Sequence, residues 1–194
     1  PHPYWESRGF TQETVDRFHL GYDPQLVRMV IPVFLGGNLI GWQKRTQNNP
    51  EWEMTTLDVK QKYKNSVGFP KDRVLYAWDE AVEDGFEVIV TEGPLDALTL
   101  RQAGFNAVAT FSAHVGQEQL NRLRFWDSVI LFPDCDRAGL SGYLSALRQL
   151  HEHTEVFMIV PEAGEDANSV SEDRLVELVR NKQPAMKILL ALSE

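Results

Sequence analysis

The sequence predicts an α/β protein with a parallel sheet in its second half and a smaller mixed α/β subdomain before it. From residue 86 onward, four short apolar runs alternate with segments of helical length. These runs are apolar at consecutive positions, which is typical of strands buried on both faces. Strands of this kind that alternate with helices indicate a parallel sheet covered by helices on both sides.

The first half of the chain begins with a predicted helix and continues into a hairpin. Thr11 is a good N-cap for a helix over residues 11–21, and Gly21 is expected to end it. Two apolar runs at residues 28–35 and 38–46 flank Gly36 and Gly37. A glycine pair between two such runs predicts a β-hairpin. The segment from residue 48 to residue 70 is polar and shows little pattern.

The second half is expected to contain four strand–helix units in succession. Proline in the first turn and glycine at the end are helix signals, and Pro94 and Gly104 bound the first helix in this way. The strands are expected at residues 86–93, 106–111, 127–136 and 155–161, and the helices at residues 94–104, 116–125, 137–153 and 171–181. We therefore expect three parts: a mixed subdomain over 1–85, a catalytic domain over 86–182 and a C-terminal helix over 183–194.

Composition excludes several classes of protein. Of the 194 residues, 43% are hydrophobic and 24% are charged, as in ordinary globular domains. No apolar run approaches the roughly 20 residues that span a bilayer, and no secretory signal is visible. One cysteine, Cys135, allows neither an internal disulfide nor a cysteine-rich zinc site. A cytoplasmic location is the expectation, and the absence of an initiating Met suggests a fragment.

Charge is distributed unevenly along the chain. The formal net charge of −9 argues against a protein that simply coats nucleic acid. Between Lys44 and Arg73, however, seven basic residues stand against four acidic ones, whereas from Phe86 onward nine basic residues stand against sixteen acidic ones. This division is compatible with phosphate binding in one segment and metal binding in the other.

Acidic residues follow three of the four predicted strands. Glu92 ends the first strand, Asp134 and Asp136 end the third, and Asp166 follows the fourth. Ligands of open parallel sheets bind at the carboxyl ends of the strands. Clustered carboxylates repel one another, and Mg²⁺, which takes oxygen ligands, would relieve that repulsion. The alternative is that these acids cap helices, and a helix-dipole role is the simpler interpretation of Asp96.

Two glycines and the cysteine support a site at this edge. Gly93 follows Glu92, where a missing Cβ would let the backbone approach a phosphate or a metal-bound water. Gly139 lies one turn into a predicted helix, where glycine costs about 1 kcal/mol and close packing is needed to justify it. Cys135, between the two aspartates, is expected to be a small buried apolar side chain rather than a nucleophile.

These residues resemble the TOPRIM domain, a Rossmann-like domain shared by DnaG-type primases, topoisomerases and some nucleases. The resemblance covers roughly residues 86–180 and rests on the sequences EGPLDAL, DCDRAG and PEAGEDANSV. The third of these resembles a Gly-x-Asp-x-Asn/Asp motif and places Asp166 and Asn168 in it. Glu165 departs from the family pattern, because lysine is common there. The sequence FSAHV also departs from it, so His114 is expected to be a loop residue without a catalytic role.

The first half is similar to the N-terminal subdomain of bacterial and phage primase cores. The sequences YWESRGFTQETVDRFHLGY, GWQKR, KYKNS and PKDRVLY occur in the order found there. This resemblance implies that four residues contact phosphates of the template or nucleotide: Arg45, Lys62, Asn65 and Lys71. The short C-terminal helix resembles a reduced form of a helical subdomain, and the compact form suggests a phage or mobile-element origin.

The resemblance implies a nucleotidyltransferase that joins ribonucleoside triphosphates into short RNA primers on a single-stranded DNA template. Asp134 and Asp136 would bind Mg²⁺ or Mn²⁺, Glu92 would bind a metal or accept a proton, and Asp166 would hold a second metal. Zinc is not expected in this chain. A replicative helicase is the expected protein partner, and no membrane is expected to take part.

Two alternatives remain open at this point. A TOPRIM-type nuclease would use the same acids to activate water against a phosphodiester. A non-catalytic nucleic-acid-binding module of a replication protein would instead stack bases on aromatic side chains. The candidates for such stacking are Trp42, Trp52, Tyr63 and Trp78.

Overall fold

The computed structural model describes residues 2–46, 62–134, 137–162 and 164–191. The chain divides into two compact units, Pro1–Phe69 and Pro70–Glu194. This division lies earlier in the chain than the boundary expected at residue 85. Leu75 belongs to the hydrophobic core of the second unit, and Tyr76 forms a β-bridge with Ala109 of that unit. The segment from residue 70 to residue 85 therefore packs with the second unit.

The N-terminal unit contains an antiparallel sheet with the strand order β1-β2-β3-β4. Its elements are α1 (Pro3–Ser7), α2 (Gln12–Arg17), β1 (Gly21–Asp23), β2 (Arg28–Leu35), β3 (Asn38–Thr46) and β4 (Tyr63–Asn65). The predicted hairpin is confirmed as β2 and β3. Gly36 and Gly37 connect the strands with φ angles of 59° and 73°, which glycine adopts without strain.

Two local predictions for this unit were only partly right. Thr11 is the N-cap of α2, as expected, and accepts a hydrogen bond from the Thr14 N–H at 3.2 Å. The helix ends at Arg17 rather than at Gly21, because Gly21 begins β1. The segment expected to be irregular contains β4, a three-residue strand that pairs with β3.

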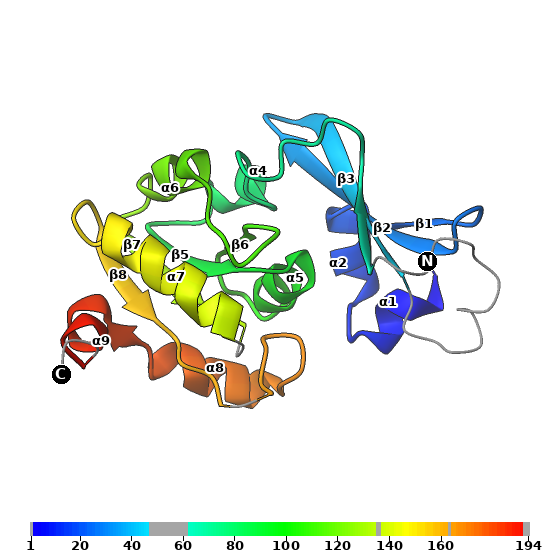
Figure 1. Cartoon of the computed structure of the whole chain (residues 1–194). Coiled ribbons are helices and arrows are strands. Elements are labelled where there is room, and N and C mark those ends of the chain that lie inside the picture. The colour runs from blue at the N-terminus through cyan, green and yellow to red at the C-terminus, as the bar shows by residue number, and fades with distance from the viewer. Residues whose placement is uncertain (1, 47–61, 135–136, 163, 192–194) are drawn as a thin grey trace. The chain divides into compact units, whose positions relative to one another are not determined.

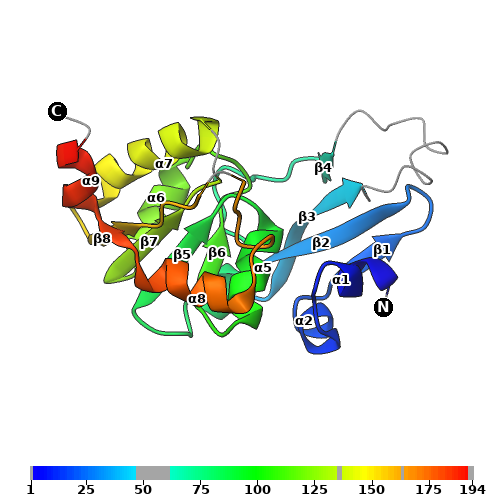
Figure 2. The same cartoon turned by 90° about the horizontal axis from the view of Figure 1, so that it is seen from below.

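The C-terminal unit contains a five-stranded sheet with the order β6-β5-β7-β8-β9 (Figures 1 and 2). Its strands are β5 (Glu87–Thr91), β6 (Ala107–Ala109), β7 (Ser128–Phe132), β8 (Glu155–Met158) and β9 (Gln183–Pro184). Its helices are α4 (Trp78–Ala81), α5 (Pro94–Gln102), α6 (Gln117–Leu123), α7 (Arg137–Leu150), α8 (Glu172–Arg180) and α9 (Ala185–Ala191).

The predicted parallel sheet is confirmed for β5 to β8. These four strands pair in parallel, and β9 adds a short antiparallel edge next to β8. The sequence did not reveal β9, because two residues are too few to show a strand pattern. The expected C-terminal helix is present as α9.

Both faces of this sheet are covered, as the continuous apolar runs predicted. Val88 and Val90 of β5 lie in a buried cluster with residues of α6, α7 and α9. Ile89, which alternates with them, is 2% exposed and therefore buried on the opposite face. Figure 2 shows α7 on one side of the sheet and α5 and α8 on the other. In the part of the chain that the structure describes, no helix combines the length and apolar character needed to cross a bilayer.

Replacing Gly142 with alanine tests the close approach of α7 to the loop after β6. An ideal Cβ at this position would lie 2.0 Å from the main-chain oxygen of Ala113. We expect Gly142→Ala to lower the free energy of unfolding by about 1–3 kcal/mol, as overpacking does, despite the better helix propensity of alanine. Urea denaturation measures the change, and Ser145→Ala, at an exposed position of α7, is the control. Equal stabilities of the two variants would contradict the close approach.

Candidate active site

Glu92 and Asp134 meet at the carboxyl edge of the parallel sheet. The neighbouring strands β5 and β7 end at Thr91 and Phe132, just before these two acids. The main-chain N–H of Asp134 donates a hydrogen bond to Oε1 of Glu92 at 3.2 Å. Both acids are partly buried. The structure thus brings together two of the predicted site residues, which lie 42 positions apart in the sequence.

Gly139 makes this meeting possible. An ideal Cβ at residue 139 would lie 2.2 Å from Oε1 of Glu92 and 2.7 Å from the main-chain oxygen of Asp134. Atoms do not approach one another so closely, so the first turn of α7 needs a glycine here. The prediction that Gly139 reflects close packing is confirmed by this geometry, and the packing partner is the candidate site itself.

At Gly93 the structure shows a second use for the missing Cβ, while the predicted approach of the backbone to a phosphate or metal-bound water stays a prediction. The φ angle of Gly93 is −95°, which any residue can adopt, so conformational freedom does not explain it. An ideal Cβ would lie 2.6 Å from Oδ2 of Asp96. Among the described residues, the space beside Gly93 is therefore occupied by a carboxylate of the same helical turn.

Asp96 does more than face the N-terminus of α5. Its Oδ1 accepts a hydrogen bond from the main-chain N–H of Asn168 at 3.2 Å. The Asn168 side chain also donates to Oγ1 of Thr99 at 2.8 Å. These contacts of Asp96 and Thr99 with the segment PEAGEDANSV were not predicted from the sequence. Their position in the helix that follows Glu92 was the one available signal.

Asp166 has a carboxylate oxygen that no described residue donates to. Its Oδ1 is buried and accepts no hydrogen bond within the described part of the chain. The backbone of this residue is well held: its N–H donates to Oγ of Ser169 at 2.8 Å, and its carbonyl accepts from the Ser169 N–H at 3.1 Å. A buried carboxylate oxygen without a donor loses hydration energy, so a cation would be a favourable partner for it.

Tyr143 of α7 lies beneath the acids. Its side chain is fully buried, and its hydroxyl lies 3.2 Å from Oγ1 of Thr110. Burial raises the pKa of this phenol well above 10.0, and the negative charges of Glu92, Asp134 and Asp96 raise it further. The phenol therefore stays neutral, and the three carboxylates lie close enough to act on the same buried group.

The donor set suits a hard cation. Carboxylate oxygens are the ligands that Mg²⁺ prefers; Glu92 and Asp134 carry them at the sheet edge, and Asp166 carries them in the loop after β8. Asp136 and Cys135 lie outside the described residues, so their predicted roles stay predictions. Among the residues that are described, no three His, Cys, Asp or Glu side chains are grouped closely enough to hold a metal.

Arg45 is the most unusual of the predicted phosphate-binding residues. It lies on β3 opposite Tyr63 of β4, and its guanidinium is 5.4 Å from the centre of that ring. Arg45 is 7% exposed, and its Nε has no hydrogen-bond partner in the part of the chain that is described. Buried guanidinium groups are normally paired, so an anionic ligand would suit this position.

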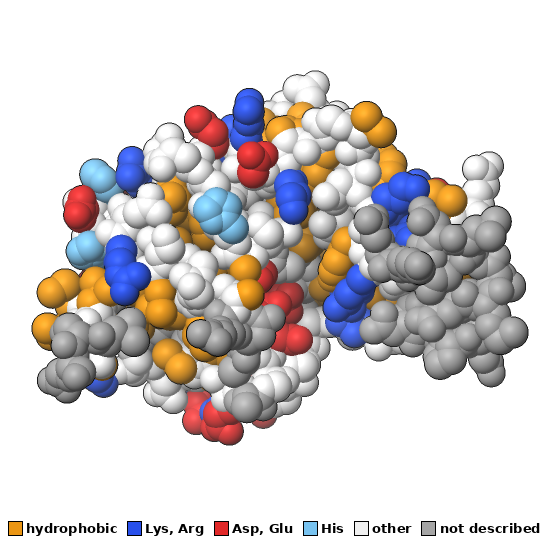
Figure 3. All heavy atoms as spheres, viewed as in Figure 1, with side chains coloured by type: hydrophobic (Ala, Val, Ile, Leu, Met, Phe, Trp, Pro, Cys, Tyr) orange, Lys and Arg blue, Asp and Glu red, His pale blue; other side chains and the backbone are white. Residues whose placement is uncertain are grey.

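The other three residues predicted to contact phosphates lack the deep burial of Arg45. Lys62 is exposed and lies 5.6 Å from the Tyr63 ring. Asn65 accepts a hydrogen bond from the Gln43 side chain at 3.2 Å. Lys71 belongs to the second unit, where its side chain is exposed and its carbonyl accepts from Gln119 at 2.9 Å. On the face that Figure 3 shows, Lys and Arg side chains are scattered rather than gathered over one element.

Three of the four aromatic residues considered for base stacking have contacts within the protein. Trp42 lies beneath Lys44, and the centre of its ring is 4.2 Å from the Lys44 Nζ. Tyr63 contacts both Arg45 and Lys62. Trp78 packs edge to face against Trp126 at 5.3 Å, and Trp52 lies outside the described residues. These contacts favour a structural role for the three described rings.

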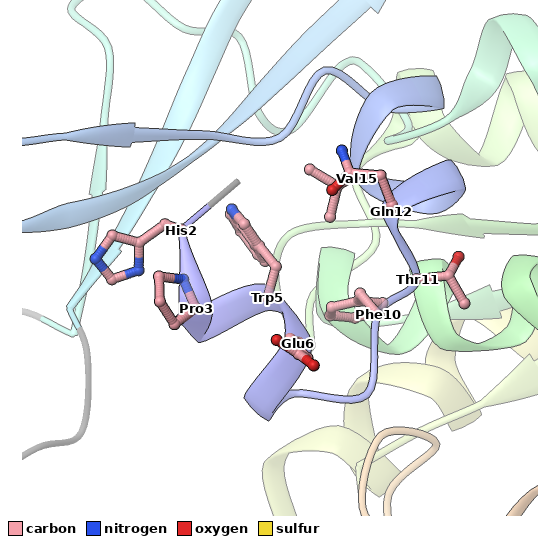
Figure 4. A pocket seen from close by; sticks show the side chains of 8 residues that line it. All are labelled: His2, Pro3, Trp5, Glu6, Phe10, Thr11, Gln12 and Val15. Atoms are coloured by element: carbon pink, nitrogen blue, oxygen red, sulfur yellow. The ribbon is translucent and has the colours of Figure 1, made fainter.

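A pocket in the N-terminal unit is lined by none of the predicted site residues. It has a volume of about 380 Å³. Figure 4 shows its lining, which comes from α1, α2 and the residues beside them: His2, Pro3, Trp5, Glu6, Phe10, Thr11, Gln12 and Val15. Glu6 makes this lining unfavourable for phosphate, so the pocket adds nothing to the candidate site.

The two departures from the family pattern have clear positions in the structure. Glu165, where lysine was expected from the resemblance, forms a two-pronged ion pair with Arg174 at 3.0 and 3.1 Å. The hydrogen bond from Arg174 lowers the pKa of the Glu165 carboxyl. His114 is an exposed loop residue, as predicted.

Comparison with known proteins gives a family match within the second unit and relatives that extend over both units. Residues 89–171 match the Toprim-like family. The DNA primase of Thermotoga maritima is 27% identical over an alignment of 232 positions, gaps included, which covers 98% of this chain and 41% of that primase. The DNA primase of Campylobacter jejuni is 36% identical over 124 residues, covering 59% of this chain and 19% of that primase. The chain thus spans less than half the length of these relatives.

Solved structures show the same architecture along nearly the whole chain. A DNA primase domain from Pseudomonas aeruginosa matches with a TM-score of 0.81 and 25% identity, covering 97% of this chain and 74% of that domain. A DnaG primase catalytic domain bound to single-stranded DNA matches with a TM-score of 0.80 and 23% identity, covering 97% of this chain and 73% of that one. The predicted resemblance to the DnaG-type primase core is confirmed. Glu92 and Asp134, which are joined by a hydrogen bond, both lie within the Toprim-like segment.

Substitution of Gly139 tests the geometry of the acids directly. We expect Gly139→Ala to break the hydrogen bond between the Asp134 N–H and Glu92, because the added methyl group would overlap Oε1. Exchange of the Asp134 amide hydrogen, followed by NMR, should then accelerate by about tenfold or more, as expected for losing a hydrogen bond to a charged group. Glu92→Gln, which keeps an acceptor oxygen, is the control. Unchanged exchange in Gly139→Ala would show that the two acids are not held in this way.

Proposed function

We propose that this chain is the catalytic core of a DNA primase, which makes short RNA primers on single-stranded DNA by metal-dependent nucleotidyl transfer. The observation that carries the proposal is the hydrogen-bonded pair Glu92 and Asp134 at the sheet edge, within a chain similar to DnaG cores. One similar catalytic domain is described as bound to single-stranded DNA, which supports the same template here.

In the proposed reaction, a primer 3′-hydroxyl attacks the α-phosphate of a ribonucleoside triphosphate. A new P–O bond forms, the bond to the leaving pyrophosphate breaks, and the hydroxyl loses its proton. Mg²⁺ or Mn²⁺, when bound, would neutralise charge on the transferring and leaving oxygens. Asp134 and Asp136 would hold one ion, and Asp166 would hold a second. Glu92 would complete the first ion site or accept the proton.

The basic residues would position the nucleic acid. Arg45 offers a buried guanidinium without a carboxylate partner among the described residues, and such a group binds phosphate well. Lys62 and Lys71 are exposed and would act as point charges on phosphates. Asn65 would contribute an amide for a hydrogen bond to the nucleotide or template. A replicative helicase would be the partner that brings this core to the template.

A Toprim nuclease is the alternative that uses the same acids. In that case, the acids would activate water for attack on a phosphodiester. The similarity to DnaG cores extends through the N-terminal unit, and this extent favours primer synthesis. Incubation with labelled ribonucleotides, Mn²⁺ and single-stranded DNA separates the two reactions, because one yields new oligonucleotides and the other yields template fragments.

The acids give a direct test of primer synthesis. We expect Asp134→Asn and Asp136→Asn to lower the rate by at least about a thousandfold, because each removes a charged metal ligand. Primer length and amount are measured on a denaturing gel. Cys135→Ala, between the two, should retain activity. Primer synthesis by Asp134→Asn at the wild-type rate would reject the proposed site.

Arg45 gives a test of binding. We expect Arg45→Met to weaken binding to single-stranded DNA or nucleotide by about tenfold and to reduce the salt dependence by about one phosphate contact. Its free energy of unfolding should stay within about 1 kcal/mol of wild type, because an apolar group of similar size replaces a buried charge. Fluorescence anisotropy at several salt concentrations measures binding. Arg148→Met, at an exposed end of α7, is the control. Equal affinities for the two variants would remove Arg45 from the binding surface.

A further inference from the structure

The loop between β8 and α8 carries Asp166 and is attached to helices on two sides. β8 ends at Met158 and α8 begins at Glu172, so this connection has no strand or helix of its own over its described residues. In Figure 1 the loop lies beside α5. A loop that must present a carboxylate needs contacts that fix it, because loops are the more mobile part of a fold.

The attachment to α5 is made by three side chains. Asp96 accepts the main-chain N–H of Asn168 at 3.2 Å, and Thr99 accepts the Asn168 side-chain amide at 2.8 Å. Thr99 in turn donates its hydroxyl hydrogen to the carbonyl of Leu95 at 3.1 Å, so its oxygen is oriented to accept from Asn168. Asn168 is thus held through both its backbone and its side chain, two residues after Asp166.

The attachment to α8 is made by one arginine. Arg174 donates to Glu165 at 3.0 and 3.1 Å and to Glu162 at 3.1 Å. This contact lies on the other side of Asp166 in the sequence. The loop is therefore held before and after Asp166, by α8 and by α5 respectively.

Asp96 is placed for a structural hydrogen bond rather than for a ligand. Its Oδ1 faces the Asn168 N–H. Its Oδ2 lies only 2.6 Å from the position that an ideal Cβ of residue 93 would take, which is too close for a side chain at that residue. The Glu92-Gly93 sequence thus leaves room for Asp96 to reach the loop, which explains a glycine that the backbone conformation does not require.

We propose that Asp96, Thr99 and Asn168 form a positioning clamp that holds Asp166 at the catalytic edge, with Asp96 acting as a hydrogen-bond acceptor and not as a metal ligand. The proposal rests on the proposed function, since Asp166 matters only if this edge is the reacting site. It assigns Asp96 and Thr99 a role that acts through another residue. The positioning residues set where the Asp166 carboxylate lies, and the acids at the strand ends bind the reacting groups.

The test compares substitutions that separate hydrogen bonding from charge. Asp96→Asn keeps an acceptor oxygen but removes the charge, whereas Asp96→Ala removes both. Thr99→Val keeps nearly the same shape and removes the acceptor for Asn168, together with the local hydrogen bond from the Thr99 hydroxyl to the Leu95 carbonyl. The matched control is Thr154→Val, because the Thr154 hydroxyl bonds main-chain oxygens of Trp126 and Asp127, at the opposite ends of the strands.

Two measurements are made on each full-length variant, without substrate. Hydrogen exchange of the Asn168 main-chain N–H in metal-free protein reports whether its hydrogen bond to Asp96 is formed. Binding of Mn²⁺, followed by electron paramagnetic resonance, reports whether the Asp166 carboxylate is positioned to bind a metal ion. We expect Asp96→Ala to accelerate exchange and to weaken Mn²⁺ binding by about tenfold each, as loss of a hydrogen bond to a charged group would. Thr99→Val should shift both in the same direction, and Asp96→Asn and Thr154→Val should stay within about threefold of wild type.

Each outcome decides between the two roles of Asp96. If Asp96→Asn lost Mn²⁺ as fully as Asp96→Ala while the Asn168 amide stayed protected, Asp96 would be a ligand and the proposal would be overturned. Unchanged exchange in both Asp96→Ala and Thr99→Val would also overturn it. Absence of primer synthesis in the wild-type chain would reject the proposed function instead, and the hydrogen-exchange result would still report whether the clamp exists.

Discussion

The hydrogen bond from the Asp134 N–H to Glu92 is the contact on which the candidate site depends. It joins the ends of β5 and β7, two neighbouring parallel strands, through a charged acceptor. Charge-assisted hydrogen bonds are stronger than neutral ones, so this bond fixes the spacing of the acids. Gly139 leaves the required space in α7. The sheet, the acids and the following helix therefore constrain one another.

The rest of the C-terminal unit supports that contact. The buried rows of β5 and β7 align the two strand ends, and Tyr143 packs beneath them as a neutral phenol. The loop that carries Asp166 starts with a main-chain hydrogen bond from Ile159 to Leu131 of β7. Side chains of α5 and α8 hold it on both sides of Asp166. Strand pairing thus brings Glu92 and Asp134 together, whereas side-chain hydrogen bonds hold the residues on both sides of Asp166.

Much of this could be predicted because the signals are local. Continuous apolar runs identified the buried parallel strands, the pair Gly36 and Gly37 identified the hairpin, and strand-end placement identified Glu92 and Asp134. The short strands β1, β4 and β9 escaped prediction because two or three residues show no periodicity. The contact between Asp96 and Asn168 joins residues 72 positions apart, and a local sequence pattern cannot predict a contact over that separation.

The ion pair between Glu165 and Arg174 has a consequence for engineering this core. The family pattern places lysine where this chain has Glu165, so a consensus redesign would introduce lysine there. That change would set two cations against each other, since Arg174 now donates to both Glu165 oxygens. The substitution is thus better made together with a change at residue 174. Segments exchanged between this core and a related protein should therefore include both positions.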